Sequence, residues 1–284
     1  MLKRLGVVVA FALLGACSTT TQEAPAAAPE VRVYAIDCGT AVFPDVGMFA
    51  DDHSMDRVAR TLAVPCYLIR HPHGDLIWDT GFPDALAAQP MNAMGGTMSR
   101  HTTLRASLQQ LGLAPADIEY LSFSHGHGDH VGNGNLFAAH STWIVDVDER
   151  AYMFRPEARA DAQSFSAYNQ LENARTQLIQ GDGDYDVFGD GSVVIIQAPG
   201  HTPGHCILQV KLAHAGTVLI TGDMWHLRES RERRLVPTFN NNRAQTLASM
   251  DKIERLVAQT RARVIREHVQ EDFDAPPRFP AALN

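Results

Sequence analysis

The sequence predicts an α/β fold, built as one domain over residues 31–284. Short apolar runs rich in β-branched residues alternate with segments of helical spacing. Four of these runs end at a histidine or an aspartate, at the position where an open α/β architecture carries its chemistry. The chain has 284 residues, of which 45% are hydrophobic, which is enough for one large core.

The predicted elements follow this alternation along the chain. Helices are expected where apolar residues recur every three or four positions, over 102–111, which stops at Gly112, and over 242–260. Segment 89–100, QPMNAMGGTMSR, is interpreted as a mobile connecting loop, or alternatively as a lid with an adaptable methionine wall. Strands are expected over 31–36, 65–69, 76–78, 118–123, 143–147, 193–197, 217–221 and 262–265.

The N-terminus has the pattern of a targeting segment. Lys3 and Arg4 precede an apolar stretch, residues 5–14, that is too short to span a membrane. The following LGAC resembles the bacterial lipobox, which implies that residues 1–17 are a signal peptide ending at a lipidated Cys17. Residues 18–30 are then a flexible tether. We therefore expect a protein anchored by lipid to a membrane of the bacterial cell envelope, facing the periplasm or the exterior.

The net charge and the cysteine content limit which partners and which disulfides are expected. The formal net charge of -8 argues against nucleic acid as a partner, because phosphate binding needs a basic face. Without Cys17, three cysteines remain, so at least one thiol is free. Cys38, Cys66 and Cys206 are interpreted as small core residues, with one possible disulfide between Cys38 and Cys66.

The run SHGHGDH, residues 124–130, predicts a metal site. His125 and His127 are two residues apart, so on an extended segment they point to the same side and can hold one ion. Asp129 and His130 follow a glycine turn that can direct them to a neighbouring position. Imidazole and carboxylate ligands suit zinc, with iron or manganese as alternatives. A histidine-rich surface loop is disfavoured because four such groups in six residues rarely cluster by chance.

Three later residues follow predicted strands and could complete two sites. They are His201 in PGHTPGH, Asp223 in TGD, and His268. This order, together with DTG at 79–81, resembles the metallo-β-lactamase superfamily over nearly all of residues 31–284. The resemblance implies a four-layer αββα sandwich with one ion on His125, His127 and His201, a second on Asp129, His130 and His268, and Asp223 bridging them.

The other polar residues are expected to have supporting or surface roles. Asp79 is expected to support a ligand by hydrogen bonding, and His205 to stabilise the turn behind the ligands. The remaining histidines have no partner pattern, and most are expected at the surface: His53, His71, His73, His101, His140 and His214. The charged run 228–234 is interpreted as a solvated loop.

Within the superfamily the sequence is most similar to the N-acyl homoserine lactonase group. The similar stretches are IWDTGF at 77–82, the Met/Gly segment after it, FSH and VGN around the histidine motif, and HVQEDF at 268–273. The resemblance implies a dinuclear hydrolase for a small ester or lactone, the chemistry of quorum quenching. Two ions lower the pKa of a shared water so that hydroxide attacks the carbonyl, while Asp129 orients the nucleophile and carries a proton.

Two positions depart from that group. Many of its members have a tyrosine that donates to the substrate carbonyl where this chain has His226, and an acidic residue where it has Val269. Imidazole can also donate a hydrogen bond, so His226 is a candidate catalytic residue. The alternative is that His226 points to solvent and Trp225 faces the cavity.

Other functions remain open from the sequence. A thioesterase of the glyoxalase II kind, or another ester hydrolase, is the main alternative. The bridging Asp223 argues against a true β-lactamase, and His127 stands where diiron flavoproteins typically use glutamate. A sulfur dioxygenase with one iron and a non-catalytic, metal-holding lipoprotein are the remaining alternatives.

Overall fold

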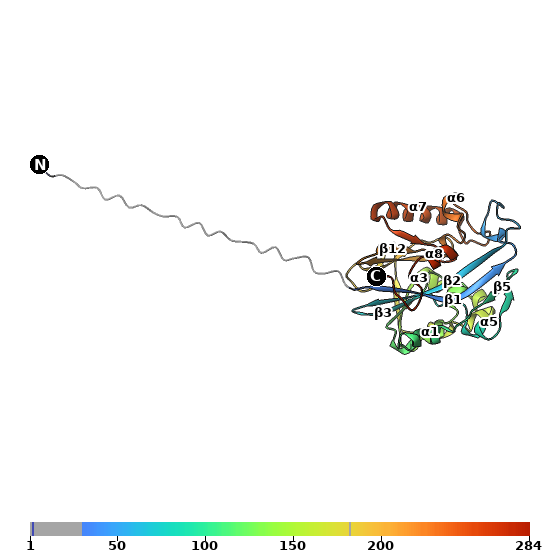
Figure 1. Cartoon of the computed structure of the whole chain (residues 1–284), viewed down its shortest axis with the longest axis horizontal. Coiled ribbons are helices and arrows are strands. Elements are labelled where there is room, and N and C mark those ends of the chain that lie inside the picture. Colours follow the sequence, from blue (N-terminus) through green and yellow to red (C-terminus); the bar gives the residue numbers. More distant parts are fainter. Residues whose placement is uncertain (1, 3–29, 182) are drawn as a thin grey trace.

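The computed structural model describes residue 2, residues 30–181 and residues 183–284 (Figure 1). The predictions for residues 1–17 and 18–30, including lipidation of Cys17, lie outside the described residues, apart from residues 2 and 30. Within the described ranges, no helix is both long enough and apolar enough to cross a membrane.

The larger sheet is formed by the first two thirds of the chain. In its spatial order, the four neighbouring pairs from β4 (Met91–Ala93) to β3 (Gly74–Trp78) are antiparallel, and the three pairs from β3 to β8 (Thr176–Ile179) are parallel. β1 (Arg32–Phe43) and β2 (Arg60–His71) are much longer than predicted, because residues 40–43 of β1 and residues 60–63 of β2, which lie outside the predicted strands, pair with each other. In spatial order the strands are β4 (Met91–Ala93), β5 (Gly96–Ser99), β1 (Arg32–Phe43), β2 (Arg60–His71), β3 (Gly74–Trp78), β6 (Tyr120–Ser122), β7 (Thr142–Asp146) and β8 (Thr176–Ile179).

The smaller sheet is formed by the second part of the chain. Only its β12–β13 pair is parallel. β11 was not predicted, because Gln209 and Lys211 interrupt its apolar pattern, although Gln209 is buried in the structure. In spatial order the strands are β13 (Arg263–Ile265), β12 (Gly216–Ile220), β11 (Cys206–Leu212), β10 (Val193–Gln197) and β9 (Tyr185–Asp186).

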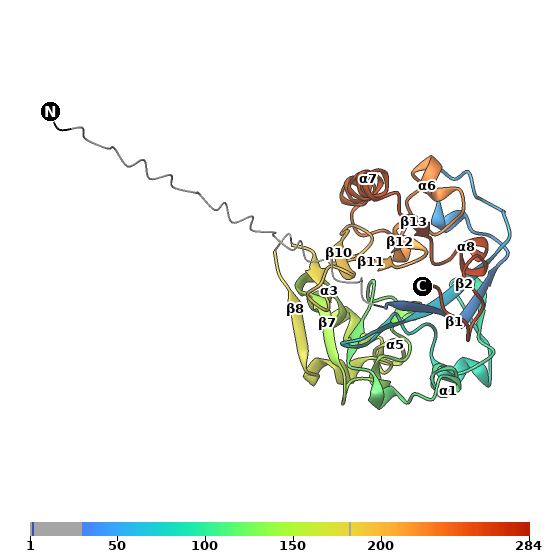
Figure 2. The same cartoon turned by 60° about the vertical axis from the view of Figure 1, so that its left-hand side comes forward.

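Side chains alternate between two faces of each sheet, and this alternation builds the layers. On β1, Val33 and Ala35 join the core between the sheets, whereas Tyr34 and Ile36 pack under the helices of the outer face. On the smaller sheet, α7 (Arg243–Thr260) covers the outer face, where Met250 contacts the sheet's apolar side chains. Figure 2 shows α7 and α1 (Leu104–Gln110) on opposite sides of the two sheets. The predicted four-layer αββα sandwich is therefore confirmed.

The remaining helices are short and lie in connections. α6 falls within the charged run 228–234, so that run is not simply the solvated loop that was predicted. The short α-helices are α2 (Gly128–Val131), α3 (Val147–Met153), α4 (Pro156–Ala160), α5 (Ala162–Phe165), α6 (Ser230–Arg233) and α8 (Gln270–Asp274). The 3-10 helices are η1 (Gly47–Phe49), η2 (Asp84–Ala87), η3 (Pro115–Asp117), η4 (Gly134–Leu136), η5 (Asn169–Asn173) and η6 (Gly222–Met224).

The Met/Gly segment is a β-hairpin, so the prediction of a loop is wrong. Met94 and Gly95 both have positive φ, the conformation of a tight two-residue hairpin turn. β5 pairs with β1, which extends the sheet, and Met98 is buried in an apolar cluster with Phe49. The sequence concealed the hairpin because methionine is an unusual residue at a positive φ.

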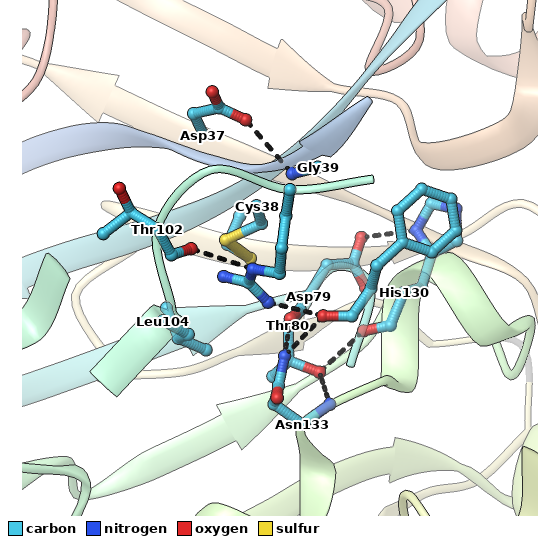
Figure 3. Close-up of a disulfide and its surroundings, with 12 residues drawn as sticks. Asp37, Cys38, Gly39, Asp79, Thr80, Thr102, Leu104, His130 and Asn133 are labelled. Atoms are coloured by element: carbon cyan, nitrogen blue, oxygen red, sulfur yellow. Dashed lines mark hydrogen bonds and ion pairs between the residues drawn. A yellow bond between two sulfur atoms is a disulfide. The ribbon is translucent and has the colours of Figure 1, made fainter. Parts of the chain in front are cut away.

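The predicted disulfide joins β1 to β2. Cys38 and Cys66 are bonded, with their Cα atoms 5.7 Å apart, while Cys206 is buried and unpaired among the described residues. Gly81, in the loop after β3, packs so closely on Cys38 that a Cβ at this glycine would lie 2.3 Å from the Cβ of Cys38. The disulfide therefore fixes the position of Cys38, against which the loop after β3 packs (Figure 3).

The loop after β3 is in turn bonded to the histidine motif. The backbone N–H and the hydroxyl of Thr80 donate to the carbonyl of His130, at 2.7 and 3.0 Å. The Asn133 amide donates to the carbonyls of Thr80 and Phe82, at 2.7 and 2.8 Å. Figure 3 shows these bonds beside the disulfide. The position of His130 thus depends on segments far apart in the sequence.

Candidate metal centre

The predicted ligands lie at one end of the sandwich, each directly after a strand or in the motif that follows it. His125 follows β6, and His127 is the N-cap of α2, which contains Asp129 and His130. The other three follow strands of the smaller sheet: His201 after β10, Asp223 in η6 after β12, and His268 after β13. The structure therefore brings all seven predicted ligands together.

The first cluster consists of three imidazoles whose nitrogen atoms converge. His127 Nδ1 lies 2.8 Å from His125 Nε2 and 3.1 Å from His201 Nε2. A neutral imidazole has only one N–H, so three converging ring nitrogens cannot satisfy one another by hydrogen bonding. The arrangement is that of ligands around a single ion.

Asp223 lies between the first cluster and a second one. Its Oδ2 is 3.3 Å from His125 Nε2 and 3.2 Å from His201 Nε2. Its Oδ1 is 3.1 Å from His130 Nε2 and 2.8 Å from His268 Nε2. One carboxylate thus presents one oxygen to each cluster.

Asp129 completes the second cluster at its exposed side. Its two oxygens are 3.8 Å from His130 Nε2 and 3.7 Å from His268 Nε2. Its side chain is 29% exposed, whereas the two histidines are buried. The second cluster therefore opens toward solvent through a carboxylate.

The donor set fits two metal ions. The ligand atoms of each cluster lie within 4.8 Å of one another. His130 Nε2 and Asp223 Oδ1 are buried, yet neither makes a hydrogen bond to any described residue. Buried polar atoms without partners are costly, and a cation would satisfy both. Five imidazoles and two carboxylates in two such clusters are a set suited to zinc.

The charges in the site also favour cations. Burial lowers the pKa of His125 well below its ordinary value and that of His127 to about 3, so both rings are neutral and have free lone pairs. Burial opposes ionisation of Asp223, but the rings of His226 and His130 outweigh it and hold its pKa well below the usual range. The first cluster therefore combines neutral imidazoles with an ionised carboxylate. In the second cluster burial opposes protonation, but the Asp223 charge outweighs it and raises the pKa of His130 and of His268.

Asp79 supports a ligand, as predicted. Its Oδ2 lies 3.0 Å from His130 Nδ1, and its Oδ1 accepts the Ser124 N–H at 2.7 Å. This contact directs Nε2 of His130 into the site. Behind it, Glu267 Oε2 lies 3.5 Å from the same ring nitrogen, and burial and the Asp79 charge raise the pKa of Glu267 well above its ordinary value.

His205 also has its predicted supporting role. Its Nε2 accepts the backbone N–H of Asp223 at 3.1 Å, and its Nδ1 lies 3.0 Å from the carbonyl of Ala198. This buried ring joins the turn after β10 to the turn after β12. It is not close enough to the clustered nitrogens to belong to either ligand group.

Two supporting residues were not predicted. Asn240 lies before α7, with its Oδ1 3.3 Å from His201 Nδ1 and its amide donating to the Gly200 carbonyl at 3.0 Å. Glu149 on α3 is buried and accepts hydrogen bonds from the Gly126 N–H and the Thr202 hydroxyl, at 2.7 and 2.6 Å. The sequence gives no signal for Asn240, and Glu149 reads as an ordinary acidic residue in the first turn of a helix.

His226 is buried and faces the site, whereas Trp225 packs in the core beneath α7. His226 Nε2 lies 2.9 Å from Asp223 Oδ2 but makes no hydrogen bond to any described residue. Its ring contacts the rings of Phe49 and His268, with centroids 5.1 and 5.6 Å away. Burial lowers the pKa of His226 to about 4, so the ring is neutral at neutral pH. The alternative in which His226 points to solvent is therefore wrong.

A cavity of about 370 Å³ opens beside His226 and His268. Its walls come from the start of β2, the segment before α6 and the N-terminal end of α8, and its rim carries the ion pairs Arg60–Glu229 and Arg228–Glu271. A volume of this size accommodates a small organic molecule. Of the predicted ligands, His268 lines this cavity, which therefore adjoins the second cluster.

A separate cluster, formed by His71, His73 and Asp190, is not a comparable metal site. His71 Nδ1 accepts the backbone N–H of His73 at 3.0 Å, so its Nε2 carries the proton and faces Asp190 at 2.9 Å. A metal ligand needs that nitrogen free. His71 is buried, against the expectation for most of the unassigned histidines, because its ring stacks on Phe188.

Comparison with known proteins places this geometry in context. The family profile described as the metallo-beta-lactamase superfamily matches residues 59–274. The N-acyl homoserine lactonase AttM of Azorhizobium caulinodans is 32% identical over 230 residues, which span 78% of this chain and 86% of that protein. The N-acyl homoserine lactonase of Bacillus cereus is 28% identical over 77% of this chain and 86% of that protein.

Solved structures show the same fold. An N-acyl homoserine lactone hydrolase with N-hexanoyl-L-homoserine bound at its catalytic metal centre aligns with a TM-score of 0.73 and 24% identity, over 89% of this chain and 98% of that chain. The dizinc lactonase AidC aligns with a TM-score of 0.62 and 16% identity, over 89% and 90% of the two chains. Because the profile covers most of the chain and the order and geometry of the motifs agree with it, this protein belongs to the metallo-beta-lactamase superfamily.

Proposed function

We propose that this protein is a two-zinc hydrolase that opens the ring of N-acyl homoserine lactones. The observation that carries the proposal is Asp223, whose Oδ1 and Oδ2 each face a separate cluster of histidine nitrogens. The relatives at 28–32% identity whose names specify this activity support the choice of substrate.

The ligand assignment follows from the two clusters. One ion would be held by His125, His127 and His201, and the other by Asp129, His130 and His268, with Asp223 shared between them. When bound, two such ions supply an activated water and polarise the carbonyl of the lactone.

Asp129 is positioned to move the proton. It is the one ligand whose carboxylate reaches the exposed side of the site, and its oxygens lie almost 4 Å from the neighbouring imidazoles. A carboxylate in that position can orient a water and accept its proton. It can then return the proton to the alkoxide that leaves when the ring opens.

His226 is positioned to bind the substrate carbonyl. Its ring is neutral, is held by Phe49 and His268, and lines the cavity. A neutral imidazole can donate one N–H to the oxygen on which negative charge develops. We assign His226 the role that a phenolic hydroxyl would otherwise fill.

The experiment combines metal analysis with a panel of substrates. We expect about two zinc ions per chain and hydrolysis of N-acyl homoserine lactones in preference to thioesters such as S-lactoylglutathione. A single tightly bound iron with turnover of a persulfide would replace the proposal with a sulfur dioxygenase, and a preference for thioesters would replace it with a thioesterase.

His226 is tested by two substitutions. His226→Ala should lower kcat/KM by about 10²–10³, as loss of one oxyanion donor does, with no change in metal content. His226→Tyr should retain much of the activity because it restores a donor. Parental rates in the alanine variant would remove His226 from the reaction.

We also propose that the protein is attached to a membrane of the bacterial cell envelope by lipid on Cys17. The signal pattern of residues 1–17 supports this, and the Cys38–Cys66 disulfide supports an oxidising compartment. Cys17→Ala should move the protein from the membrane fraction to the soluble fraction. A variant that fractionates like the parent would contradict lipidation.

A further inference from the structure

Glu149 connects the two turns that carry the first ligand cluster. Its Oε1 accepts the N–H of Gly126, the residue between His125 and His127, at 2.7 Å. Its Oε2 accepts the Thr202 hydroxyl at 2.6 Å and the Gly204 N–H at 3.0 Å, in the turn that begins at His201. The carboxylate is buried, so these three donors have no water to replace it.

Helix α3 fixes the direction of this carboxylate. The N-cap Asp146 accepts the backbone N–H groups of Asp148 and Glu149 at 2.8 and 3.3 Å through its Oδ1. Its Oδ2 accepts the Gln197 side-chain amide at 2.8 Å, and Gln197 is the last residue of β10, which leads to His201. The N-terminal end of α3 is therefore hydrogen-bonded to the end of β10, and Glu149 on the same helix supports the turn that follows β10.

The two glycines allow the close approach that these bonds require. A Cβ at Gly204 would lie 2.4 Å from the backbone nitrogen of Glu149. A Cβ at Gly126 would lie 2.5 Å from the Met153 side chain on the same helix. Both turns thus press directly on α3 and leave little freedom for the histidines beside them.

We propose that Glu149 is a positioning residue that sets the spacing of His125, His127 and His201 for one of the two ions. Among the described residues, Glu149 makes its hydrogen bonds to the backbone of Gly126 and Gly204 and to Thr202, and none to the three rings. The inference rests on the two-metal site of the proposed function and is independent of the substrate.

The residues that hold only the second ion are oriented by groups other than Glu149. Asp129 and His130 are on α2, where Asp79 orients His130. His268 Nδ1 lies 2.7 Å from the carbonyl of Ala63 on β2. Loss of Glu149 should therefore weaken one site selectively, which general destabilisation would not do.

The test measures metal affinity in two backgrounds. Asp129→Ala retains the His125–His127–His201 site, and His201→Ala retains the other. Metal-free proteins are titrated with Zn²⁺ against a competing chelator, with and without Glu149→Ala. We expect about a 10–100-fold loss of affinity in the Asp129→Ala background, the range for losing a residue that supports ligands, and little change in the His201→Ala background.

Two further variants keep the test interpretable. Glu149→Gln retains one acceptor oxygen and should lose less affinity than Glu149→Ala. Asp79→Asn, the matched control, should show the reverse selectivity because Asp79 supports His130. Equal losses in both backgrounds, or no loss in either, would overturn the proposal for Glu149. A parent that binds fewer than two ions would instead contradict the two-metal site itself.

Discussion

The Cys38–Cys66 disulfide should contribute a large part of the stability of this protein. The two cysteines are 28 residues apart in sequence and fully buried, on the adjacent strands β1 and β2. Closing a loop of that length lowers the entropy of the unfolded chain enough to stabilise the fold by about 3.5 kcal/mol at 25 °C. For a domain of this size, about 1 kcal/mol corresponds to about 2–4 °C in Tm. The double variant Cys38→Ala/Cys66→Ala should therefore melt about 7–14 °C below the parent.

Thermal denaturation of the metal-free proteins provides the measurement. Reductant should lower the Tm of the parent toward that of the double variant and leave the variant unchanged. Cys206→Ala, a substitution of a buried cysteine that is not in the disulfide, is the control for lost packing alone and should shift Tm much less. If the reduced parent and the double variant both melt like the oxidised parent, the entropic argument is refuted.

Three further predictions follow from particular contacts. Gly200→Ala should destabilise the fold by about 2 kcal/mol or more and reduce the metal content. The reason is that Gly200 has φ +133° and that a Cβ there would lie 2.3 Å from the backbone nitrogen of Thr246. An unchanged melting temperature and metal content would contradict this prediction. Asn240→Ala should weaken metal binding about 10-fold or more by releasing His201, as measured by chelator competition, and parental affinity would exclude that role. Burial raises the pKa of Glu149 from 4.5 to about 7, so the fold favours the protonated form of this carboxyl group. This preference stabilises the fold fully below pH 4.5, and the stabilisation is lost as the pH rises through about 7. Relative to Glu149→Gln, the metal-free parent should lose about 3 kcal/mol of unfolding free energy over that window, and parallel pH profiles of the two proteins would refute it.

The sequence by itself predicted the residues of the proposed ligand set and their placement at strand ends. The motif at residues 125–130 is local, and the turns at His201 and Asp223 each follow a continuous apolar run, so these runs were enough to place them at strand ends. The four-layer sandwich was expected from the resemblance of these motifs to the metallo-β-lactamase superfamily. The sequence left the Cys38–Cys66 disulfide as one possibility, because the three cysteines after residue 17 allow more than one pairing.

The tertiary structure decided which residues hold those ligands in position. Glu149 accepts the N–H of Gly126, which is 23 residues away and lies between two predicted ligands. Asn240 and the carbonyl of Ala63 contact His201 and His268, at separations of 39 and 205 residues. No local pattern reports contacts across such separations. The β4–β5 hairpin also depends on a distant partner, because β1 supplies the edge on which it forms. Local periodicity records which face of an element is apolar, whereas the partners of buried polar groups are chosen only when the two sheets pack together. For that reason the chemistry of this site could be predicted from the sequence, and the residues that hold its geometry could not.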